Sequence, residues 1–155
     1  MTNVAIPAIV LATASAIGAA VGVAPSLLGK TDAQAASYSE PLFTCTVTDG
    51  DTIRCGDERI RLLGIDAPEL PGHCRHGREC ADGDGHASTE SLRTAITGSL
   101  TIERVGQDRY GRTLALVAGG KGDLSCWQLA QRQAIYKARW DNGLRVARTC
   151  PKAAL

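Results

Sequence analysis

The residues of this chain that combine into one recognisable chemistry lie in four short blocks. The blocks are Asp49-Gly50-Asp51-Thr52, Arg61, Asp66-Ala67-Pro68-Glu69 and Asp108-Arg109-Tyr110-Gly111-Arg112. They bring together carboxylates that suit a hard cation, a carboxylate that suits a general base, and arginines that suit a phosphate. Phosphodiester hydrolysis requires this set, because the substrate is an anion whose charge must be offset while a base prepares the attacking water.

Each of these residues, taken alone, also has a structural interpretation. We interpret Asp49 as structural, because an aspartate that starts a turn accepts hydrogen bonds from nearby backbone N–H groups. The alternatives for the others are turn-forming roles for Asp51 and Asp66, a solvated carboxylate for Glu69, a surface ion pair with Glu103 or Asp57 for Arg61, a strand-end cation for Arg112, and packing for Tyr110. The combination in this order favours the catalytic interpretation.

The elements that must position these residues are short strands and helices. Runs of apolar and β-branched residues predict strands over 42–48, 52–55, 59–65, 100–105 and 113–118. Asp49-Gly50 is a strong hairpin signal between the first two strands. Helices are expected over 86–97, from an N-cap at Asp123 to about 133, and within 141–150. Five strands with flanking helices predict a small α+β domain rolled into a barrel.

The six cysteines all follow residue 44, and an even number in an exported domain indicates a disulfide framework. A hairpin centred on Gly50 places Cys45 opposite Cys55. Cys74 and Cys80 lie in one loop, which leaves Cys126 and Cys150 as the third pair. An alternative is a zinc site that uses side chains of the same loop, namely His73, Cys74, His76, Cys80 and His86.

The first 35 residues read as a targeting segment. No residue between Val4 and Gly29 is charged, and Ala33-Gln34-Ala35 fits the small-x-small pattern of signal peptidase. The apolar stretch 4–29 is also long enough for an uncleaved membrane anchor. We therefore expect residues 1–35 to be a signal peptide or an N-terminal anchor, and residues 36–155 to be the folded domain. The protein would be periplasmic, secreted, or held at the outer face of the inner membrane.

Three motifs taken together resemble the staphylococcal nuclease (thermonuclease) family. They are Val47-x-Asp49-Gly50-Asp51-Thr52, Arg61-Leu62-Leu63-Gly64-Ile65-Asp66-Ala67-Pro68-Glu69 and Asp108-Arg109-Tyr110-Gly111-Arg112. The similarity covers about residues 43–140. It implies a five-stranded OB-fold barrel with about three flanking helices, and Ca²⁺-dependent cleavage of DNA and RNA to products that end in 3′-phosphate.

The resemblance also implies roles for individual residues. Asp51, Asp66 and the carbonyl of Ala67 match the calcium ligands, and Glu69 matches the residue usually assigned as general base. Arg61 and Arg112 match the arginines that contact the scissile phosphate. The positions that match the nucleotide-binding residues are Arg109, Tyr110 and, less closely, Trp140.

Two segments depart from the family pattern. The loop from Leu70 to His86 contains two cysteines and all three histidines. In the segment from Ile135 to Trp140, Tyr136 does not match a family tyrosine. The formal net charge of +1 predicts weaker attraction to DNA than a strongly basic nuclease has. We expect a monomer with a nucleic acid substrate. The alternatives are a catalytically silent nucleic-acid-binding module and an exported interaction protein that uses the Cys74–Cys80 loop.

Overall fold

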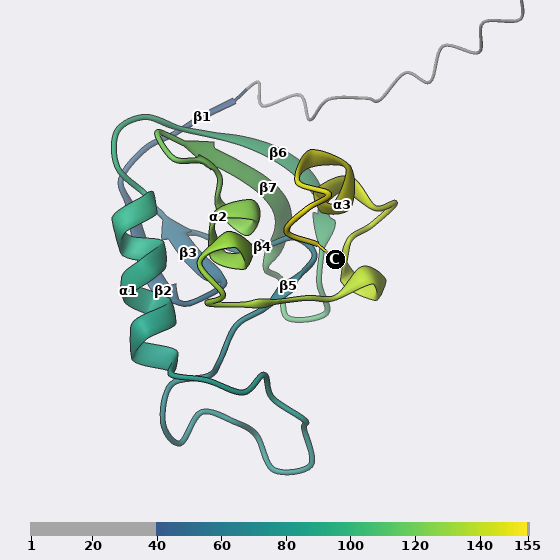
Figure 1. Cartoon of the computed structure of the whole chain (residues 1–155). Helices are drawn as coiled ribbons and strands as arrows, with labels where there is room; N and C mark the ends of the chain where they lie inside the picture. Colours follow the sequence, from purple (N-terminus) through teal and green to yellow (C-terminus); the bar gives the residue numbers. More distant parts are fainter. Residues whose placement is uncertain (1–39, 155) are drawn as a thin grey trace, which may run out of the picture. The chain divides into compact units, whose positions relative to one another are not determined.

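A curled, mostly antiparallel sheet forms the centre of the structure, a computed structural model that describes residues 40–154 (Figure 1). Its strands run in the order β1-β6-β7-β4-β3-β2, and β8 pairs with β7. A second sheet joins β5 to β9. The strands are β1 (Glu40–Leu42), β2 (Cys45–Asp49), β3 (Thr52–Cys55), β4 (Glu58–Leu62), β5 (Ile65–Asp66), β6 (Leu100–Gln107), β7 (Thr113–Gly119), β8 (Gly122–Asp123) and β9 (Ile135–Tyr136).

The helices are α1 (Gly85–Ala95), α2 (Leu124–Ala130), α3 (Arg145–Thr149) and a short 3₁₀ turn, η1 (Ala138–Trp140). In Figure 1, α1 lies beside β2 and β3, whereas α3 lies on the opposite side of the sheet's curl. The curled sheet with its helices confirms the predicted α+β, OB-fold class. The five expected strands correspond to β2, β3, β4, β6 and β7.

The β2–β3 hairpin forms where Asp49-Gly50 predicts it. Cys45 lies opposite Cys55, and Asp49 lies opposite Thr52. Gly50 packs so closely that an added Cβ would stand 2.0 Å from Ser88 Oγ on α1. Gln128 of α2 donates a hydrogen bond of 2.7 Å from Nε2 to the Gly50 carbonyl. Both helices therefore hold the turn in place.

The predicted strand over 59–65 is wrong in its continuity, because the chain breaks at Gly64. Gly64 has a φ of +71°, and a Cβ there would lie 3.0 Å from Val146 Cγ2. The break lets β4 pair in parallel with β7 while β5 pairs with β9. A side chain at this position would be strained, because the backbone is left-handed and the Cβ would crowd Val146.

The predicted strand over 42–48 is likewise two strands. Thr44 has a φ of 52°, and the chain changes partners there: β1 pairs with β6, and β2 pairs with β3. The first helix is capped by Asp84, whose carboxylate accepts from the N–H groups of His86 and Ala87. The second helix ends at Ala130, earlier than predicted, and the Asp123 cap is confirmed by a 2.8 Å bond from the N–H of Cys126.

The core fills the inside of the curled sheet and the faces of the helices. It includes Leu92 and Ala95 of α1, both fully buried. The largest apolar side chains that are fully buried are Ile53, Ile60, Leu62, Leu63, Ile65, Leu92, Ile102, Leu116, Val117, Leu124 and Val146. Every strand of the predicted barrel except β2 contributes to this set, which explains why the sheet curls around it.

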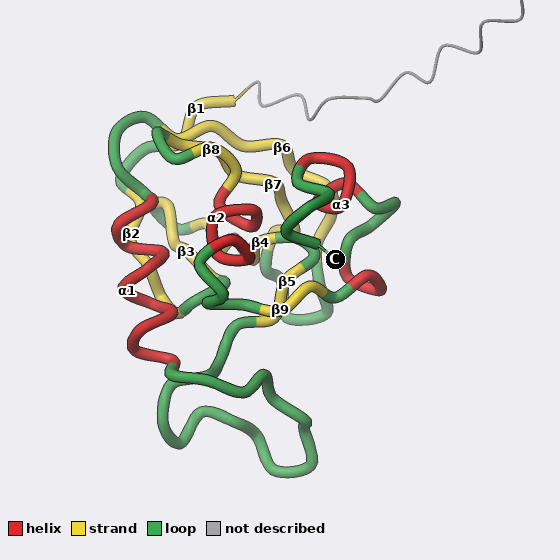
Figure 2. Tube along the Cα trace, in the orientation of Figure 1, coloured by secondary structure: helices red, strands yellow, loops and turns green. Residues whose placement is uncertain are grey.

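The structure contains the three predicted disulfides: Cys45–Cys55, Cys74–Cys80 and Cys126–Cys150. The first crosses the β2–β3 hairpin, and the third ties the end of α3 to α2. The second closes the long loop between β5 and α1, which is without helix or strand and lies at the lower edge in Figure 2.

The chain divides into two units, Met1–Asp32 and Ala33–Leu155. All described residues belong to the second unit. The predicted targeting segment over 1–35 lies outside the described residues. Among residues 40–154, no helix is both long and apolar enough to cross a membrane.

Candidate active site

Asp51 and Arg61 are brought together by the register of two strands. Thr52 of β3 lies opposite Arg61 of β4, so Asp51 at the end of the turn stands beside the guanidinium. Arg61 Nη1 lies 2.8 Å from Asp51 Oδ1, and the two residues are 9% and 4% exposed. The other carboxylate oxygen of Asp51 accepts from the N–H of Ala67 at 3.2 Å. Arg61 therefore pairs with a buried aspartate, whereas Glu103, one of its alternative partners, pairs with Arg145.

Asp66 is held by the same guanidinium. The break at Gly64 turns the chain so that β5 delivers Asp66 to Arg61, with 3.4 Å between Nη2 and Oδ1. Asp66 is 2% exposed. Arg61 therefore lies between two buried carboxylates that the sequence places fifteen residues apart, and a surface Asx-turn does not describe Asp66.

The donor set fits a hard divalent cation. Asp51 and Asp66 supply oxygen ligands, the Ala67 carbonyl is adjacent in the chain, and Ca²⁺ completes its shell with backbone carbonyls and water. Within residues 40–154, no three acidic, histidine or cysteine side chains are grouped as a metal site. Asp51 and Asp66 are the two charged members of the predicted ligand set.

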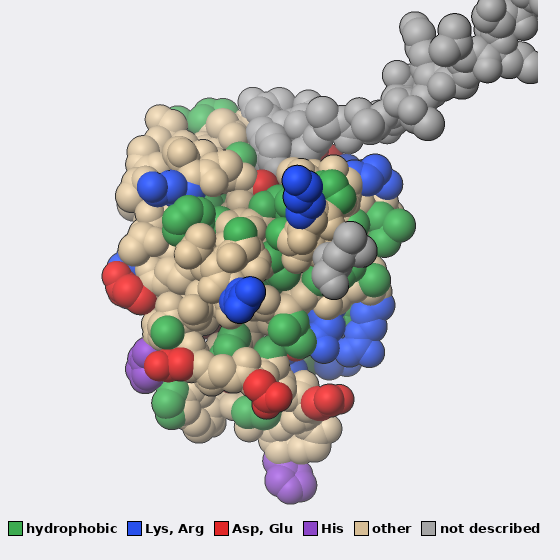
Figure 3. Space-filling view, viewed as in Figure 1, with side chains coloured by type: hydrophobic (Ala, Val, Ile, Leu, Met, Phe, Trp, Pro, Cys, Tyr) green, Lys and Arg blue, Asp and Glu red, His purple; other side chains and the backbone are tan. Residues whose placement is uncertain are grey.

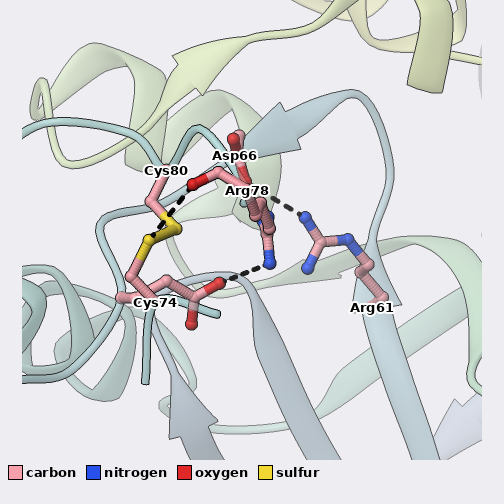
Figure 4. Close-up of a disulfide and its surroundings, with 6 residues drawn as sticks. Arg61, Asp66, Cys74, Arg78 and Cys80 are labelled. Carbon is pink, nitrogen blue, oxygen red and sulfur yellow. Dashed lines mark hydrogen bonds and ion pairs between the residues drawn. A yellow bond between two sulfur atoms is a disulfide. The ribbon is translucent and has the colours of Figure 1, made fainter. Parts of the chain in front are cut away.

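Glu69 forms an ion pair with Arg78, a residue that the sequence analysis did not select. Arg78 Nη1 lies 2.7 Å from Glu69 Oε1, and Arg78 Nη2 lies 3.0 Å from Asp66 Oδ1. One guanidinium thus joins the candidate base to a candidate metal ligand. In Figure 4, Arg78 and Asp66 lie between the Cys74–Cys80 disulfide and Arg61. The available signal in the sequence was the position of Arg78 between two cysteines in the loop that follows Glu69.

Tyr110 lies in the turn before β7 with guanidiniums around it. The guanidinium carbons of Arg75, Arg109 and Arg112 are 5.2, 4.8 and 5.5 Å from the centre of its ring. The Tyr110 hydroxyl accepts a 2.7 Å hydrogen bond from Arg109, which lowers its pKa below the ordinary value of 10. Tyr110 is 46% exposed, so packing does not account for it.

Arg112 is oriented by a carboxylate of its own turn. Both Nε and Nη2 of Arg112 lie 2.7 Å from Asp108 Oδ2. Leu114 of β7 lies opposite Arg61 of β4, and Arg112 directly precedes β7. The turn therefore ends beside the strand that carries Arg61.

Trp140 approaches the site from the other side. The guanidinium carbon of Arg61 lies 5.2 Å from the centre of the Trp140 ring, and that of Arg139 lies at the same distance. The backbone between β9 and η1 is fixed by hydrogen bonds to Gly64, which accepts from Lys137 N–H at 2.8 Å and donates to the Trp140 carbonyl at 3.1 Å. The break in the strand thus positions Asp66 and Trp140 together.

Asp49 accepts a backbone hydrogen bond in the turn, the structural role that the sequence predicts for it. Its Oδ1 accepts a hydrogen bond of 3.1 Å from the N–H of Asp51. Burial, and then the neighbouring charge of Asp51, raise the pKa of Asp49 to about 6. Asp49 stabilises the turn from which Asp51 projects.

The zinc alternative is excluded by covalent structure. Cys74 and Cys80 are joined to each other, and a disulfide has no thiolate to offer a metal. The loop is therefore closed by a covalent bond, and its arginines face the site on both sides: Arg75 at Tyr110 and Arg78 at Asp66 and Glu69.

Comparison with known proteins identifies the family to which the chain is similar. A sequence model of the family described as staphylococcal nuclease homologue matches residues 59–142. The chain belongs to this family. The matched segment contains Arg61, Asp66, Glu69 and Arg112, while Asp51 lies just before it.

Three curated relatives are similar over much of the chain. The succinoglycan biosynthesis protein ExoI of Rhizobium meliloti strain 1021 is 34% identical over 70% of this chain and 59% of its own length. The thermonuclease of Staphylococcus intermedius is 33% identical over 62% and 56%. The probable endonuclease LCL3 of Yarrowia lipolytica is 34% identical over 54% and 33%. The chain spans less than two thirds of the length of each of these relatives.

Proposed function

We propose that this protein is a nuclease that hydrolyses phosphodiester bonds of DNA, RNA or both with Ca²⁺ as cofactor. The observation that carries the proposal is the pair of buried aspartates, Asp51 and Asp66, joined by Arg61. Buried charges that the fold alone would not need are costly, and they are typical of sites that bind a charged ligand. The family membership and two relatives named as nucleases support the same activity.

The residues present account for each requirement of the reaction. Asp51, Asp66 and the Ala67 carbonyl would hold the cation, which supplies positive charge to a phosphoryl oxygen. Glu69 accepts a proton from the attacking water as the water oxygen bonds to phosphorus. Arg61 and Arg112 stabilise the added negative charge, because planar guanidiniums each grip two oxygens and remain charged.

The bond that breaks is the one between phosphorus and the 5′ oxygen of the next nucleotide. That oxygen leaves and takes a proton from solvent, and the phosphate stays on the 3′ oxygen. Tyr110, Arg109 and Trp140 line the approach, where an exposed aromatic ring and guanidiniums suit a nucleotide. The side chain of Trp140 already stacks on Arg61.

Charge on the surface favours an anionic partner on one side. The chain after Gln131 carries one acid, Asp141, against a run of cations: Arg132, Lys137, Arg139, Arg145, Arg148 and Lys152. On the face in Figure 3, basic side chains gather on the side where α3 lies in Figure 1, whereas acidic ones follow the lower edge. This distribution supports local steering of nucleic acid despite the near-neutral net charge.

The proposal includes export and a monomeric state. Three disulfides in the described domain are typical of proteins that fold in an oxidising compartment. The protein would be periplasmic, secreted, or attached to the membrane through residues 4–29. Fractionation of cells that express the full chain, with light scattering on the purified protein, tests both statements. A reduced protein in the cytoplasm would contradict export.

The test of activity uses the oxidised full chain with heat-denatured DNA at mildly alkaline pH. Cleavage is compared in Ca²⁺, Mg²⁺, Zn²⁺ and EDTA. We expect cleavage that requires Ca²⁺, and losses of about a hundredfold or more in Glu69→Gln and Arg112→Ala. Matched controls are Glu79→Gln, an exposed glutamate of the same loop, and Arg93→Ala, an exposed arginine of α1 that lies outside the basic C-terminal run. Both should retain wild-type activity.

Two alternatives give different results in that test. A silent binding module binds DNA and cleaves it in no metal. An interaction protein that uses the Cys74–Cys80 loop neither binds nor cleaves DNA, and loses its partner when the loop is shortened. The presence of all five residues, Asp51, Arg61, Asp66, Glu69 and Arg112, favours the active enzyme over both.

A further inference from the structure

Arg78 occupies the carboxylates of the site with its own charge. Its two terminal nitrogens contact Glu69 at 2.7 Å and Asp66 at 3.0 Å. The contacted oxygen of Asp66, Oδ1, is also the one that Arg61 reaches at 3.4 Å. The side chain of Asp66 is 2% exposed, whereas that of Arg78 is 37% exposed. A guanidinium from the surface thus reaches inward to a buried carboxylate.

The Cys74–Cys80 disulfide holds Arg78 in this position. Arg78 lies inside the closed loop, and its N–H donates a 3.0 Å hydrogen bond to the Arg75 carbonyl. Arg75 in turn lies against the Tyr110 ring. That exposed contact is weak, whereas the bond between the cysteines is covalent and limits how far the chain around Arg78 can move.

The charges of the site show what Arg78 does to a metal ion. Asp51, Asp66 and Glu69 face Arg61 and Arg78, which leaves one net negative charge. Without Arg78 the site would carry two, the charge that a divalent cation neutralises. A cation on Asp66 also needs the oxygen lone pairs to which Arg78 donates, and it would repel the guanidinium at that distance.

We propose that Arg78 is a tethered cation that competes with the divalent metal ion for Asp66, so that the disulfide-closed loop sets the metal affinity of the site. The inference rests on the proposed metal site and adds a residue to it. Arg78 is a positioning residue: it holds Asp66 and Glu69 in place when no metal is bound, and it leaves Asp66 when the metal binds.

The test measures Ca²⁺ binding directly, without nucleic acid. Calorimetric titration of the oxidised full chain with CaCl₂ compares wild type with Arg78→Gln. We expect Arg78→Gln to bind Ca²⁺ about fivefold more tightly, because a partly exposed ion pair that the metal must break is worth about 1 kcal/mol. A second readout is the rise in Tm on addition of Ca²⁺, which should be larger for Arg78→Gln at the same concentration.

Arg75→Gln is the matched control. It removes the same charge from the same loop, but its guanidinium contacts Tyr110 instead of a carboxylate. Its Ca²⁺ affinity should stay within about twofold of wild type, since exposed charges are screened by salt. Arg78→Lys keeps the charge but not the fork that spans both carboxylates, and Cys74→Ser with Cys80→Ser releases the tether. Both should lie between wild type and Arg78→Gln.

Each outcome decides the proposal. Tighter binding in Arg78→Gln but not in Arg75→Gln supports it, and so does binding that appears only in Arg78→Gln. Equal affinity in all variants overturns it while the metal site stands. Binding in no variant, with Ca²⁺, Mg²⁺ or Mn²⁺, overturns both the metal site and this inference. If Arg78→Gln does not fold, as judged by its melting curve in EDTA, Arg78→Lys decides by the same criteria.

Discussion

The two halves of the site are built in opposite ways. Asp51, Arg61 and Asp66 stand on or next to strands, are nearly buried, and pair with one another at the centre of the fold. The other half consists of the Cys74–Cys80 loop and the turn before β7, where Arg75 and Tyr110 meet at the surface. The side chains of the first half, the strand half, are positioned by the register of strands. Those of the second, the loop half, are positioned by a loop that a covalent bond closes.

The difference teaches where strength and adaptability reside in this site. Water cannot solvate a buried charge that has lost its partner, so the stability of each ion pair in the strand half depends on all its members. Contacts of the loop half are half exposed, screened and individually weak. The loop half is therefore the part that can give way when a metal ion or a nucleotide arrives, while the strand half keeps its geometry.

The largest effect is expected from Arg61→Gln. The change leaves Asp51 and Asp66 buried without their common partner, which should cost about 3–5 kcal/mol of unfolding free energy at neutral pH. Activity should fall at least a hundredfold. Urea unfolding measures the loss of stability, and the DNA cleavage assay measures the loss of activity. Added Ca²⁺ should restore part of the stability, because it replaces the lost positive charge.

Arg104→Gln is the control for that loss. Arg104 also lies between two carboxylates, Glu40 and Glu58, at 2.5 and 2.7 Å, but its side chain is 36% exposed. We expect a loss of at most about 1 kcal/mol. Equal losses in Arg61→Gln and Arg104→Gln would remove burial as the distinction between the two halves.

A smaller effect is expected where the loop half is anchored to α1. A Cβ on Gly85 would lie 2.3 Å from the Glu69 carbonyl oxygen, so Gly85→Ala must displace the backbone that carries Glu69. We expect a loss of about 1–3 kcal/mol and reduced cleavage, although alanine is the better helix former. Gly106→Ala is the control, since nothing lies within 4 Å of its Cβ. Wild-type behaviour of Gly85→Ala would show that Glu69 is not anchored there.

A still smaller effect, and one that depends on pH, is expected at the surface of β4. Hydrogen bonds from Arg104, and secondarily from Thr113, lower the pKa of Glu58 below its ordinary value of 4.5. The stabilisation is therefore complete above the ordinary pKa and is lost as pH falls through the folded pKa. Glu58→Gln should cost about 0.5–1 kcal/mol at pH 7 and progressively less in acid.

Urea unfolding of Glu58→Gln between pH 7 and pH 3 measures that difference. Asp57→Asn, at an exposed neighbour whose carboxylate has no described partner, is the control and should match wild type throughout. A difference between Glu58→Gln and wild type that grows toward acid pH would contradict the sign of the shift.

The features that the sequence predicts well are local ones. The Asp49-Gly50 turn, the pairing of Cys45 with Cys55 and the cap at Asp123 all follow from local signals, and all three are confirmed. Each depends on residues at most ten positions apart, where turn chemistry and strand alternation decide the structure.

The break at Gly64 and the reach of Arg78 were not predicted, because neither is local. The turn at Gly64 is fixed by contacts with Val146 and with the backbone of Trp140, which lie far along the sequence. Arg78 lies in a loop without periodicity, and its contact with Asp66 depends on how the disulfide folds that loop back. Sequence patterns predict elements, but they do not predict where an irregular loop places one side chain.

The smallest effect is expected at Tyr110, an exposed residue of the loop half. The hydrogen bond from Arg109 lowers the pKa of the Tyr110 hydroxyl, whereas burial, and then a hydrogen bond to Asp141, raise the pKa of Tyr136 to about 12. The two tyrosines therefore ionise at different pH. Tyr38→Phe, introduced into every variant, removes the third tyrosine from the absorbance signal. Absorbance at high pH should show Tyr110 titrating first.

Arg109→Gln should raise the pKa of Tyr110, and Arg148→Gln, at an exposed arginine away from the turn, should leave it unchanged. Since Tyr110 is surrounded by solvent as well as by arginines, neither change should alter unfolding free energy measurably at neutral pH. A marked destabilisation by Arg109→Gln would show instead that this cluster supports the fold as the buried aspartates do.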